Sequence, residues 1–271
     1  MHQRRNRPCG IAIAVTALLA VIPGCTPPDG GQGAAERTPE ETLADSLVDA
    51  WIEAAGGMES WEEARTLRFT IMTVWYDSVG EIRRMRPRRV EMRKAGGAEQ
   101  ARIERPEAEG LYVQVFNGDT AWATLNERPI PVGDKAADET EYVARDAVYW
   151  IGLPFKLRDP GVNRSARQTD EGYEVRVTFG DDIGAHPGDR YFYYFLDDDP
   201  FPEQVHYVEQ GKEEVDRNRT HWSNFVQVGS MVYVGSRLWV DTLGNPTKEL
   251  RIDDVWVNPD LSEALFTPPG R

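Results

Sequence analysis

The sequence predicts a mainly β (α+β) protein, a curved antiparallel half-barrel of about ten strands with an N-terminal helix and an inserted helix closing its mouth. Three observations lead to this prediction. Beyond residue 67, apolar residues recur with the two-residue period of half-buried strands. Helical periodicity occurs in two segments, one before the strands and one in their middle. Strands and helices do not alternate, and no repeat of fixed length occurs, which argues against a parallel sheet and against a solenoid.

The segment 38–55 has the pattern of an amphipathic helix. Thr38 suits the N-cap, Pro39 suits the first helical position, and Glu41 completes a capping box. Two glycines at 56–57 are a typical helix stop. The apolar face consists of Leu43, Leu47, Trp51, Ala54 and Ala55. This face requires a partner, and we expect the helix to pack on the sheet.

The strand predictions depend on alternation and on the turn residues between strands. The clearest hairpin covers 111–125, where Asn117 and Gly118 tolerate the positive φ of a tight turn. The predicted strands are 67–76, 88–93, 111–116, 120–125, 173–179, 190–196, 203–209, 221–228, 231–241 and 247–257. A helical segment at 136–151 interrupts them and leads into Leu-Pro-Phe-Lys-Leu at 153–157.

The first forty residues are typical of an exported and processed chain. Three arginines precede an apolar stretch at 11–21, which is too short to span a bilayer. The sequence Ile-Pro-Gly-Cys that follows resembles the lipobox of bacterial lipoproteins, although proline at its middle position departs from the pattern. We therefore expect a signal peptide at 1–24, lipidation of Cys25, a flexible tether at 25–39 and a single domain at 40–271.

Lipidation would place the protein on a membrane of the cell envelope. Two or more acyl chains anchor a protein durably, whereas one chain anchors it only marginally. Thr26 follows Cys25 where the sorting rule of two-membrane bacteria would require aspartate for retention. By that resemblance we expect the outer membrane, with the domain facing the periplasm. Cys9, the other cysteine, lies in the removed segment, so the mature domain has no disulfide.

The charge of the chain restricts its partners. Removal of residues 1–24 takes away three basic residues and no acidic ones, so the formal charge falls from −14 to −17. So acidic a protein is repelled by nucleic acid. Nine basic residues nevertheless gather between positions 83 and 105. Within this cluster Arg84, Arg86 and Arg88 are our candidates for contact with the anionic headgroup of a ligand.

The sequence contains no catalytic or metal-binding motif that we could assign. A Gly-x-Ser-x-Gly elbow, a His-Glu-x-x-His helix and a phosphate loop are absent. Glu203 and His206 are three residues apart, a spacing that does not converge in a strand, so a surface histidine beside a carboxylate is the simpler interpretation. The three acids at 197–199 lack the alternate spacing of a calcium loop. We expect no enzyme activity, no metal and no cofactor.

Several short motifs resemble the lipoprotein carrier and receptor superfamily, the LolA/LolB-like proteins, and in particular an uncharacterised branch of exported bacterial lipoproteins. They are the glycine pair with Trp61, Leu-Arg-Phe at 67–69, the segment 117–122, Tyr-Trp at 149–150, the segment 153–161 and the close at 265–269. The resemblance implies a half-barrel around an apolar cavity that holds acyl chains. The chain departs from the compact receptors in its extra length at 181–189 and 212–219.

Three functional hypotheses remain open at this point. The first is a non-enzymatic lipoprotein that binds a lipid, a lipoprotein acyl chain or another apolar ligand in the half-barrel. Its candidate cavity residues are Met72, Val74, Met92, Trp122, Tyr193, Tyr207 and Trp239. The second is an interaction module that docks an envelope protein and has a filled barrel. The third is an envelope hydrolase, which would need a polar cleft with a strongly perturbed carboxylate or histidine.

Overall fold

The computed structural model describes residues 37–131, 133–181, 183 and 187–268. The predicted signal peptide, Cys25 and the predicted tether up to residue 36 therefore lie outside the described residues. Within the described part, the strands form one antiparallel sheet of 13 strands in the order β6-β5-β4-β3-β2-β1-β13-β12-β11-β10-β9-β8-β7. The first strand of the chain pairs with the last, with Thr73 opposite Leu250. The sheet is thus two meanders joined at β1 and β13.

Helices come before the strand series and in its middle. The strands are β1 Thr66–Tyr76, β2 Ile82–Ala95, β3 Ala98–Glu107, β4 Gly110–Phe116, β5 Ala121–Leu125, β6 Arg128–Pro129, β7 Val162–Thr169, β8 Gly172–Phe179, β9 Arg190–Leu196, β10 Gln204–Val208, β11 Asn218–Val228, β12 Met231–Val240 and β13 Pro246–Val257. The helices are α1 Pro39–Ala54, α2 Gly57–Glu63, α3 Lys135–Asp138 and α4 Thr140–Ile151, with short 3-10 turns η1 Phe155–Arg158, η2 Glu214–Asp216 and η3 Glu263–Phe266. α1 and α2 precede the sheet, and α3, α4 and η1 connect β6 to β7.

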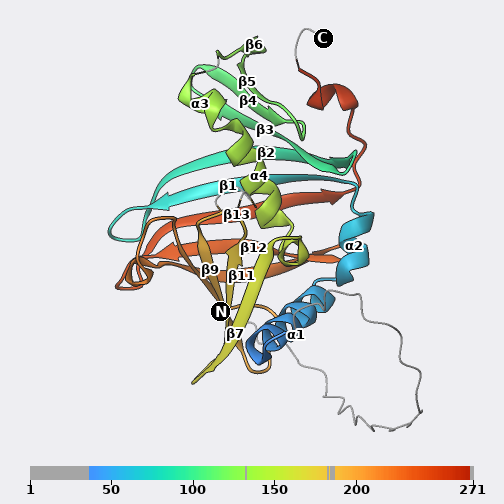
Figure 1. Cartoon of the computed structure of the whole chain (residues 1–271). Coiled ribbons are helices and arrows are strands. Elements are labelled where there is room, and N and C mark those ends of the chain that lie inside the picture. The colour runs from blue at the N-terminus through green and yellow to red at the C-terminus, as the bar shows by residue number, and fades with distance from the viewer. Residues whose placement is uncertain (1–36, 132, 182, 184–186, 269–271) are drawn as a thin grey trace, which may run out of the picture. The chain divides into compact units, whose positions relative to one another are not determined.

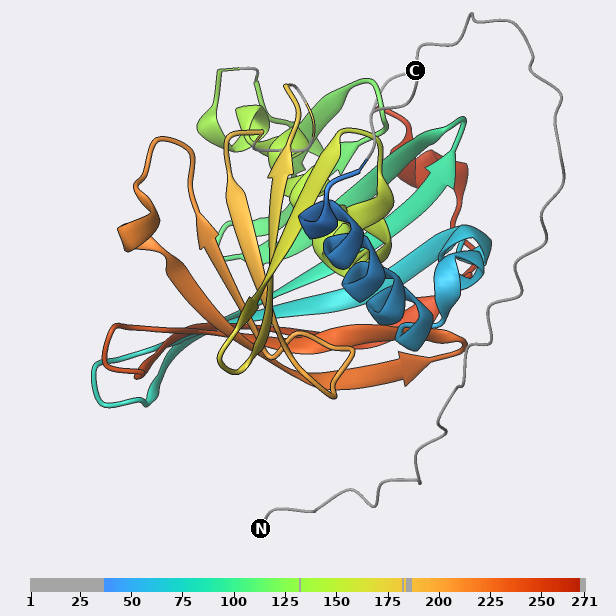
Figure 2. The same cartoon turned by 60° about the horizontal axis from the view of Figure 1, so that its bottom comes forward.

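The sheet curves around α1 and α4, which lie on its concave side (Figures 1 and 2). Strand parity defines this inner face. Leu67, Phe69 and Ile71 of β1 belong to the main core, so the residues between them point to the outer face. The curved antiparallel half-barrel with an N-terminal and an inserted helix, which the sequence predicts, is confirmed.

The capping box at the start of α1 forms as expected. The Thr38 hydroxyl accepts from the backbone N–H of Glu41 at 3.2 Å, and the Glu41 carboxylate accepts from the N–H of Thr38 at 3.0 Å. Ion pairs then fix α1 to the sheet. Asp45 of α1 pairs with Arg158 of η1 and, at 3.2 Å, with Arg164 of β7. These two arginines lower the pKa of Asp45 although its burial acts in the opposite direction.

Three of the 13 strands escaped prediction, namely β3, β6 and β7. β3 carries Glu and Arg residues on its outer face and only Ala101 and Ile103 as buried apolar residues, so its alternation is weak. β7 is an edge strand with buried residues only at Val162 and Ala166, on the face that α1 covers. Pairing with neighbouring strands, rather than local pattern, determines these segments.

Candidate functional site

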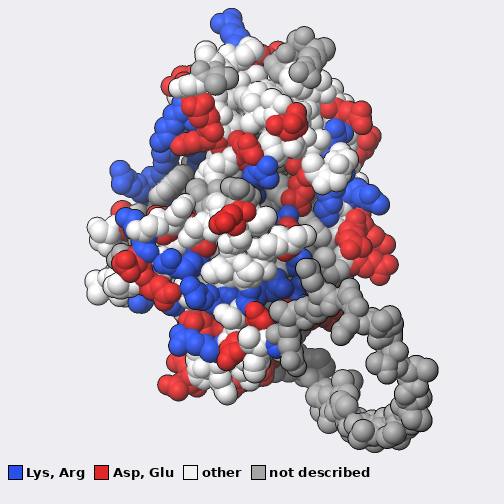
Figure 3. All heavy atoms as spheres, viewed as in Figure 1, with Lys and Arg blue, Asp and Glu red and all other residues white. Residues whose placement is uncertain are grey.

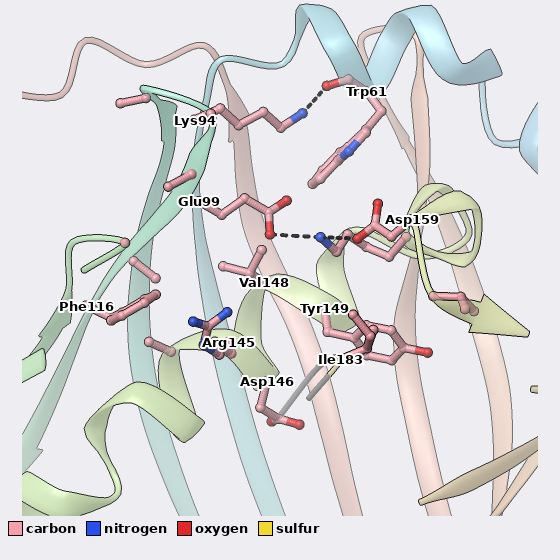
Figure 4. A pocket seen from close by; sticks show the side chains of 18 of the residues that line it. Trp61, Lys94, Glu99, Phe116, Arg145, Asp146, Val148, Tyr149, Asp159 and Ile183 are labelled. Carbon is pink, nitrogen blue, oxygen red and sulfur yellow. Dashed lines mark hydrogen bonds and ion pairs between the residues drawn. The ribbon is translucent and has the colours of Figure 1, made fainter. Parts of the chain in front are cut away.

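A pocket of about 910 Å³ opens on the concave side between α4, α2 and the sheet. Figure 4 shows its mouth and the side chains around it. Apolar and charged side chains line it together: Lys94, Glu99, Lys156 and Asp159 lie toward the Trp61 end, and Arg145 and Asp146 of α4 lie near Phe116 and Tyr149 (Figure 4). The apolar and aromatic lining residues include Met58, Trp61, Ala101, Phe116, Ala144, Val148, Tyr149, Val162, Phe179 and Tyr191.

The sheet supplies one wall of the pocket through the ends of β2, β3 and β4. Lys94 and Glu99 are cross-strand partners, and Ala101 is paired with Phe116 on the next strand. Ala101 and Phe116 belong to the same buried core as inner-face residues of β2, such as Met92. Alternation along β2 therefore places Lys94 on the inner face as well.

Helices supply the opposite walls. α4 crosses the concave side and presents Val148 and Tyr149 to the pocket (Figure 4). The Tyr149 hydroxyl is 3.3 Å from that of Tyr193, and burial raises the Tyr149 pKa well above its usual value. α2 contributes Trp61, whose ring stacks on Phe155 of η1 with centroids 5.6 Å apart. This stacking holds the Trp61 indole in a fixed position at the mouth of the pocket.

Lys94 is the most unusual charged group at the mouth. Its ammonium donates to the backbone carbonyl of Trp61 in α2 and lies 3.5 Å from the centroid of the Trp61 ring. In the described part of the chain it makes no ion pair with a carboxylate. Burial lowers the Lys94 pKa to about 8, with the nearby Lys156 and Arg65 acting in the same direction.

Lys156 is held differently. Its ammonium lies 2.8 Å from Glu99 and 2.6 Å from Asp159, and both carboxylates lie at the mouth beside it. Burial acts to lower the pKa of Lys156, but these two carboxylates outweigh it and raise the pKa above its usual value. Lys156 is thus a fixed structural cation, whereas Lys94 has a charge without a carboxylate partner.

The concave side away from the pocket is filled. Trp51 of α1 contacts the rings of Tyr193, Phe195 and Trp222 at centroid distances of 5.6, 5.8 and 6.0 Å. Arg237 is buried beside this cluster and donates to the backbone carbonyl of Trp150 at 2.6 Å. Burial lowers the Arg237 pKa to about 10.

The headgroup candidates Arg84, Arg86 and Arg88 all point to the inner face, but toward the other end of β2. Arg84 lies over Trp75 at 5.2 Å, and Arg86 pairs with Glu107 at 3.3 Å. Arg88 is six residues from Lys94, which corresponds to roughly 20 Å along a strand. These three arginines therefore do not line the pocket.

Four of the cavity candidates lie on the inner face without lining the pocket. Met92 and Tyr193 are fully buried core residues. Tyr207 and Trp239 contact each other, the indole N–H donating to the hydroxyl at 3.1 Å. Lys248 lies over the Trp239 ring at 3.8 Å. These four residues fill or rim the part of the concave side that lies outside the pocket.

The other three cavity candidates lie on the outer face. Met72 and Val74 alternate with the inward residues of β1, so the sheet itself separates them from the pocket. Trp122 packs against a separate outer cluster with Val115 and Phe266 and lines a groove of about 580 Å³ there. The structure therefore does not bring the seven candidates together in one cavity.

The pocket residues carried a weak signal in the sequence. Lys94 belongs to the basic cluster and continues the alternation of Val90 and Met92, which would have placed it on the inner face. Phe116 and Val148 resemble ordinary core residues. Their position beside a hollow space depends on how α4 crosses the sheet, which no local pattern encodes.

The described residues contain no group of three His, Cys, Asp or Glu side chains that could hold a metal ion. His206 contacts Gln204 at 3.2 Å and the Tyr194 ring at 4.5 Å, and burial lowers its pKa to about 4. On the face shown in Figure 3, acidic and basic side chains are interspersed. None of the helices in the described ranges is long and apolar enough to cross a membrane.

Comparison with solved structures identifies the fold. The chain is similar to a LolA superfamily protein from Nitrosomonas europaea (TM-score 0.53, 11% identity), to an outer-membrane lipoprotein-sorting protein domain from Vibrio parahaemolyticus (0.52, 10%) and to a DUF1329 family protein from Desulfovibrio piger (0.51, 12%). Each match covers 83% of this chain and 97% of the other. No family profile and no curated protein sequence matches the chain. The resemblance to the carrier and receptor superfamily is therefore confirmed at the level of the fold.

Proposed function

We propose that this protein is a lipid-anchored envelope protein that binds an apolar chain in the pocket beside α4 and performs no catalysis. The observation that supports this most strongly is the pocket itself, about 910 Å³, whose lining contains many apolar and aromatic side chains together with charged ones. Its size lies near the top of the usual range for ligand sites. Each methylene transferred from water into such an interior contributes about 0.8 kcal/mol, so part of one acyl chain already gives useful affinity.

The proposal also includes the anchor and the location. Cys25 would carry the acyl groups, the segment 25–39 would link them to α1, and the domain would face the periplasm from the outer membrane. The fold of lipoprotein-sorting proteins supports an envelope role by analogy only, because one fold serves many functions. Mass spectrometry of the mature protein from its host tests the anchor, which requires diacyl or triacyl mass on Cys25.

Filling the pocket tests the binding site. Val148 lies on α4 at the pocket wall and is 3% exposed, so Val148→Trp places an indole where the ligand would lie. We expect the variant to lose the lipid that co-purifies with the wild-type protein, measured by native mass spectrometry and organic extraction. Retention of stoichiometric lipid by a folded Val148→Trp variant would contradict the site.

A matched control lies at the N-cap of the same helix. Glu139 is exposed and does not line the pocket, and its ion pair with Lys135 is a surface contact of small energetic value. Glu139→Trp adds the same indole outside the pocket, so we expect it to retain lipid. Circular dichroism and thermal unfolding establish that both variants are folded.

A second candidate function is docking to an envelope protein. The β1–β2 and β12–β13 hairpins project side by side, since β1 and β13 are paired (Figure 1). Their tips expose Val79, Ile82 and Leu243 by 79, 50 and 84%. If docking is the function, replacement of Val79 and Leu243 by serine should abolish capture of a protein partner and leave the lipid content unchanged. If Val148→Trp loses lipid and still captures the partner, the result favours lipid binding in the pocket.

A further inference from the structure

We propose that the pocket binds an amphiphile with an anionic head, a carboxylate or a phosphate, and that Lys94 holds this head at the mouth. This inference rests on the proposed function, because it names the class of ligand for the same pocket. It also differs from the sequence-based expectation, which assigned the headgroup to Arg84, Arg86 and Arg88 at the other end of β2.

The first argument is that Lys94 has hydrogen-bonding capacity to spare. An ammonium has three N–H donors, and Lys94 directs one of them at the Trp61 carbonyl. Glu99 is directly opposite on β3, but its carboxylate bonds Lys156 at 2.8 Å. Among the described residues no other carboxylate pairs with Lys94. An oxyanion of a ligand would therefore supply the partner that the protein itself does not provide.

The second argument is the distribution of charge around the mouth. Glu62 and Arg65 lie near Lys94 and carry opposite charges. Lys156 is shared between Glu99, the cross-strand neighbour of Lys94, and Asp159, so two carboxylates face one ammonium there. An anionic head is therefore favoured beside Lys94 and Trp61 and disfavoured beside Asp159. In Figure 4 Lys94 and Trp61 lie above Glu99 and Asp159.

The third argument is continuity with the apolar interior. Beyond Lys94 the wall continues through Ala101 and Phe116 of the sheet and Val148 of α4, with Arg145 over the Phe116 ring. Ala101, Phe116 and Val148 are only 1, 4 and 3% exposed. The aromatic cluster around Trp51 fills the adjoining part of the concave side. An apolar chain can enter the pocket with its head at Lys94. Because the adjoining part of the concave side is already filled, the space for this chain is limited to the pocket.

Protonation of Lys94 should couple to binding. Burial lowers its pKa to about 8 in the free protein; repulsion from Lys156 and Arg65 acts in the same direction, and attraction from Glu99 and Glu62 opposes it. An anion placed beside the ammonium raises that pKa, because it favours the charged form. Affinity for an anionic ligand should therefore decrease as pH rises above about 8, while affinity for an uncharged analogue should stay constant.

The experiment compares three probes with the same chain, dodecanoate, dodecyl phosphate and dodecanamide, by isothermal titration of the full chain carrying Cys25→Ser. We expect the two anions to bind roughly tenfold or more tightly than the amide, which is the effect of one charge-assisted hydrogen bond. Lys94→Met should remove this difference by weakening only the anions, and Lys94→Arg should largely retain it. A preference for one anion identifies the head as carboxylate or phosphate.

Lys248→Met is the matched control. Lys248 also lies over a tryptophan, Trp239, and burial also lowers its pKa, but it is outside the pocket. We expect this variant to bind all three probes as the wild type does. Equal affinities for the three probes in the wild type, or anion selectivity that persists in a folded Lys94→Met variant, would overturn the role of Lys94 and leave the proposed function intact. If the wild type binds none of the probes, the proposed function itself fails.

Discussion

The concave side of the sheet has two halves that differ in how their space is used. In the filled half, α1 packs on β7 and β8, and Trp51 contacts three aromatic rings of β9 and β11. In the pocket half, α4 and α2 stand over the ends of β2 to β4 and leave about 910 Å³ open. Both halves are lined by buried apolar side chains of similar types. The difference lies in whether a helix places a large side chain into the space, so apolar composition alone does not indicate a binding site.

The largest expected effect comes from emptying the filled half. Trp51 is 1% exposed and occupies the centre of the aromatic cluster. Trp51→Ala should reduce the free energy of unfolding by about 3–5 kcal/mol, because a buried indole leaves a cavity that the structure closes only in part. Chemical denaturation measures this loss. A loss below about 1 kcal/mol, outside the range for such sites, would mean that this half is not tightly packed.

A matched pair of valines compares the two halves directly. Val48 of α1 is fully buried in the filled half, and Val148 of α4 is 3% exposed at the pocket wall. Val48→Ala should cost about 2 kcal/mol, since it loses two buried carbons and creates a new cavity. Val148→Ala should cost about 1 kcal/mol, since it only enlarges a space that already exists. Equal losses in urea unfolding would contradict the distinction between the halves.

Acid should weaken the sheet from its outer face, where alternation along β10 places His206. Burial lowers the pKa of His206 to about 4, below the usual histidine value of 6.5. The neutral form is therefore favoured on folding, and its stabilising effect is present above pH 6.5 and lost as pH falls toward 4. Allowing for partial exposure, the loss should be about 1–2 kcal/mol. His206→Gln should flatten the pH dependence of unfolding over this range, and an unchanged slope would exclude His206 as its source.

Raising the pH should stabilise the pocket half through Lys94, and this effect should be smaller than that of acid on His206. Its pKa is lowered to about 8 from 10.5, so folding favours the neutral amine. The free energy of unfolding should rise as pH increases from about 8 to 10.5, because the unfolded chain binds the proton more tightly. Solvent exposure limits this gain to about 1 kcal/mol. Denaturation of the wild type and Lys94→Met between pH 7 and 10.5 checks it, and parallel curves would contradict it.

The sequence predicts those features that depend on local chemistry. The capping box of Thr38 and Glu41 forms, and the turn at Asn117 and Gly118 joins β4 to β5, with Gly118 at φ +94°. The capping box and this turn each depend only on residues that are close together in the sequence. The fold class follows because such elements are consistent with one another.

The site could be predicted only in part. The prediction that Met72, Val74 and Trp122 share a cavity with Tyr193 relied on residue type, but these three point to the outer face. Parity along β1 could have separated Met72 and Val74 from Phe69. The location of the hollow space depends on the long-range packing of α4, and among the described residues Glu99 pairs with the distant Lys156 and not with its cross-strand neighbour Lys94. Neither relation is present in any short segment of the chain.

The most direct test of the account locates a bound chain within the protein. We would titrate isotope-labelled protein with dodecanoate that carries a nitroxide spin label near its methyl end and record backbone amide signals. The account predicts that broadening is strongest at Ala101, Phe116 and Val148 in the pocket half and weaker at Trp51 and Trp239, which lie farther from the bound chain. Broadening centred on Trp51, Tyr193 or Trp239, or no broadening at saturating probe, would contradict the claim that the pocket beside α4 is the ligand site.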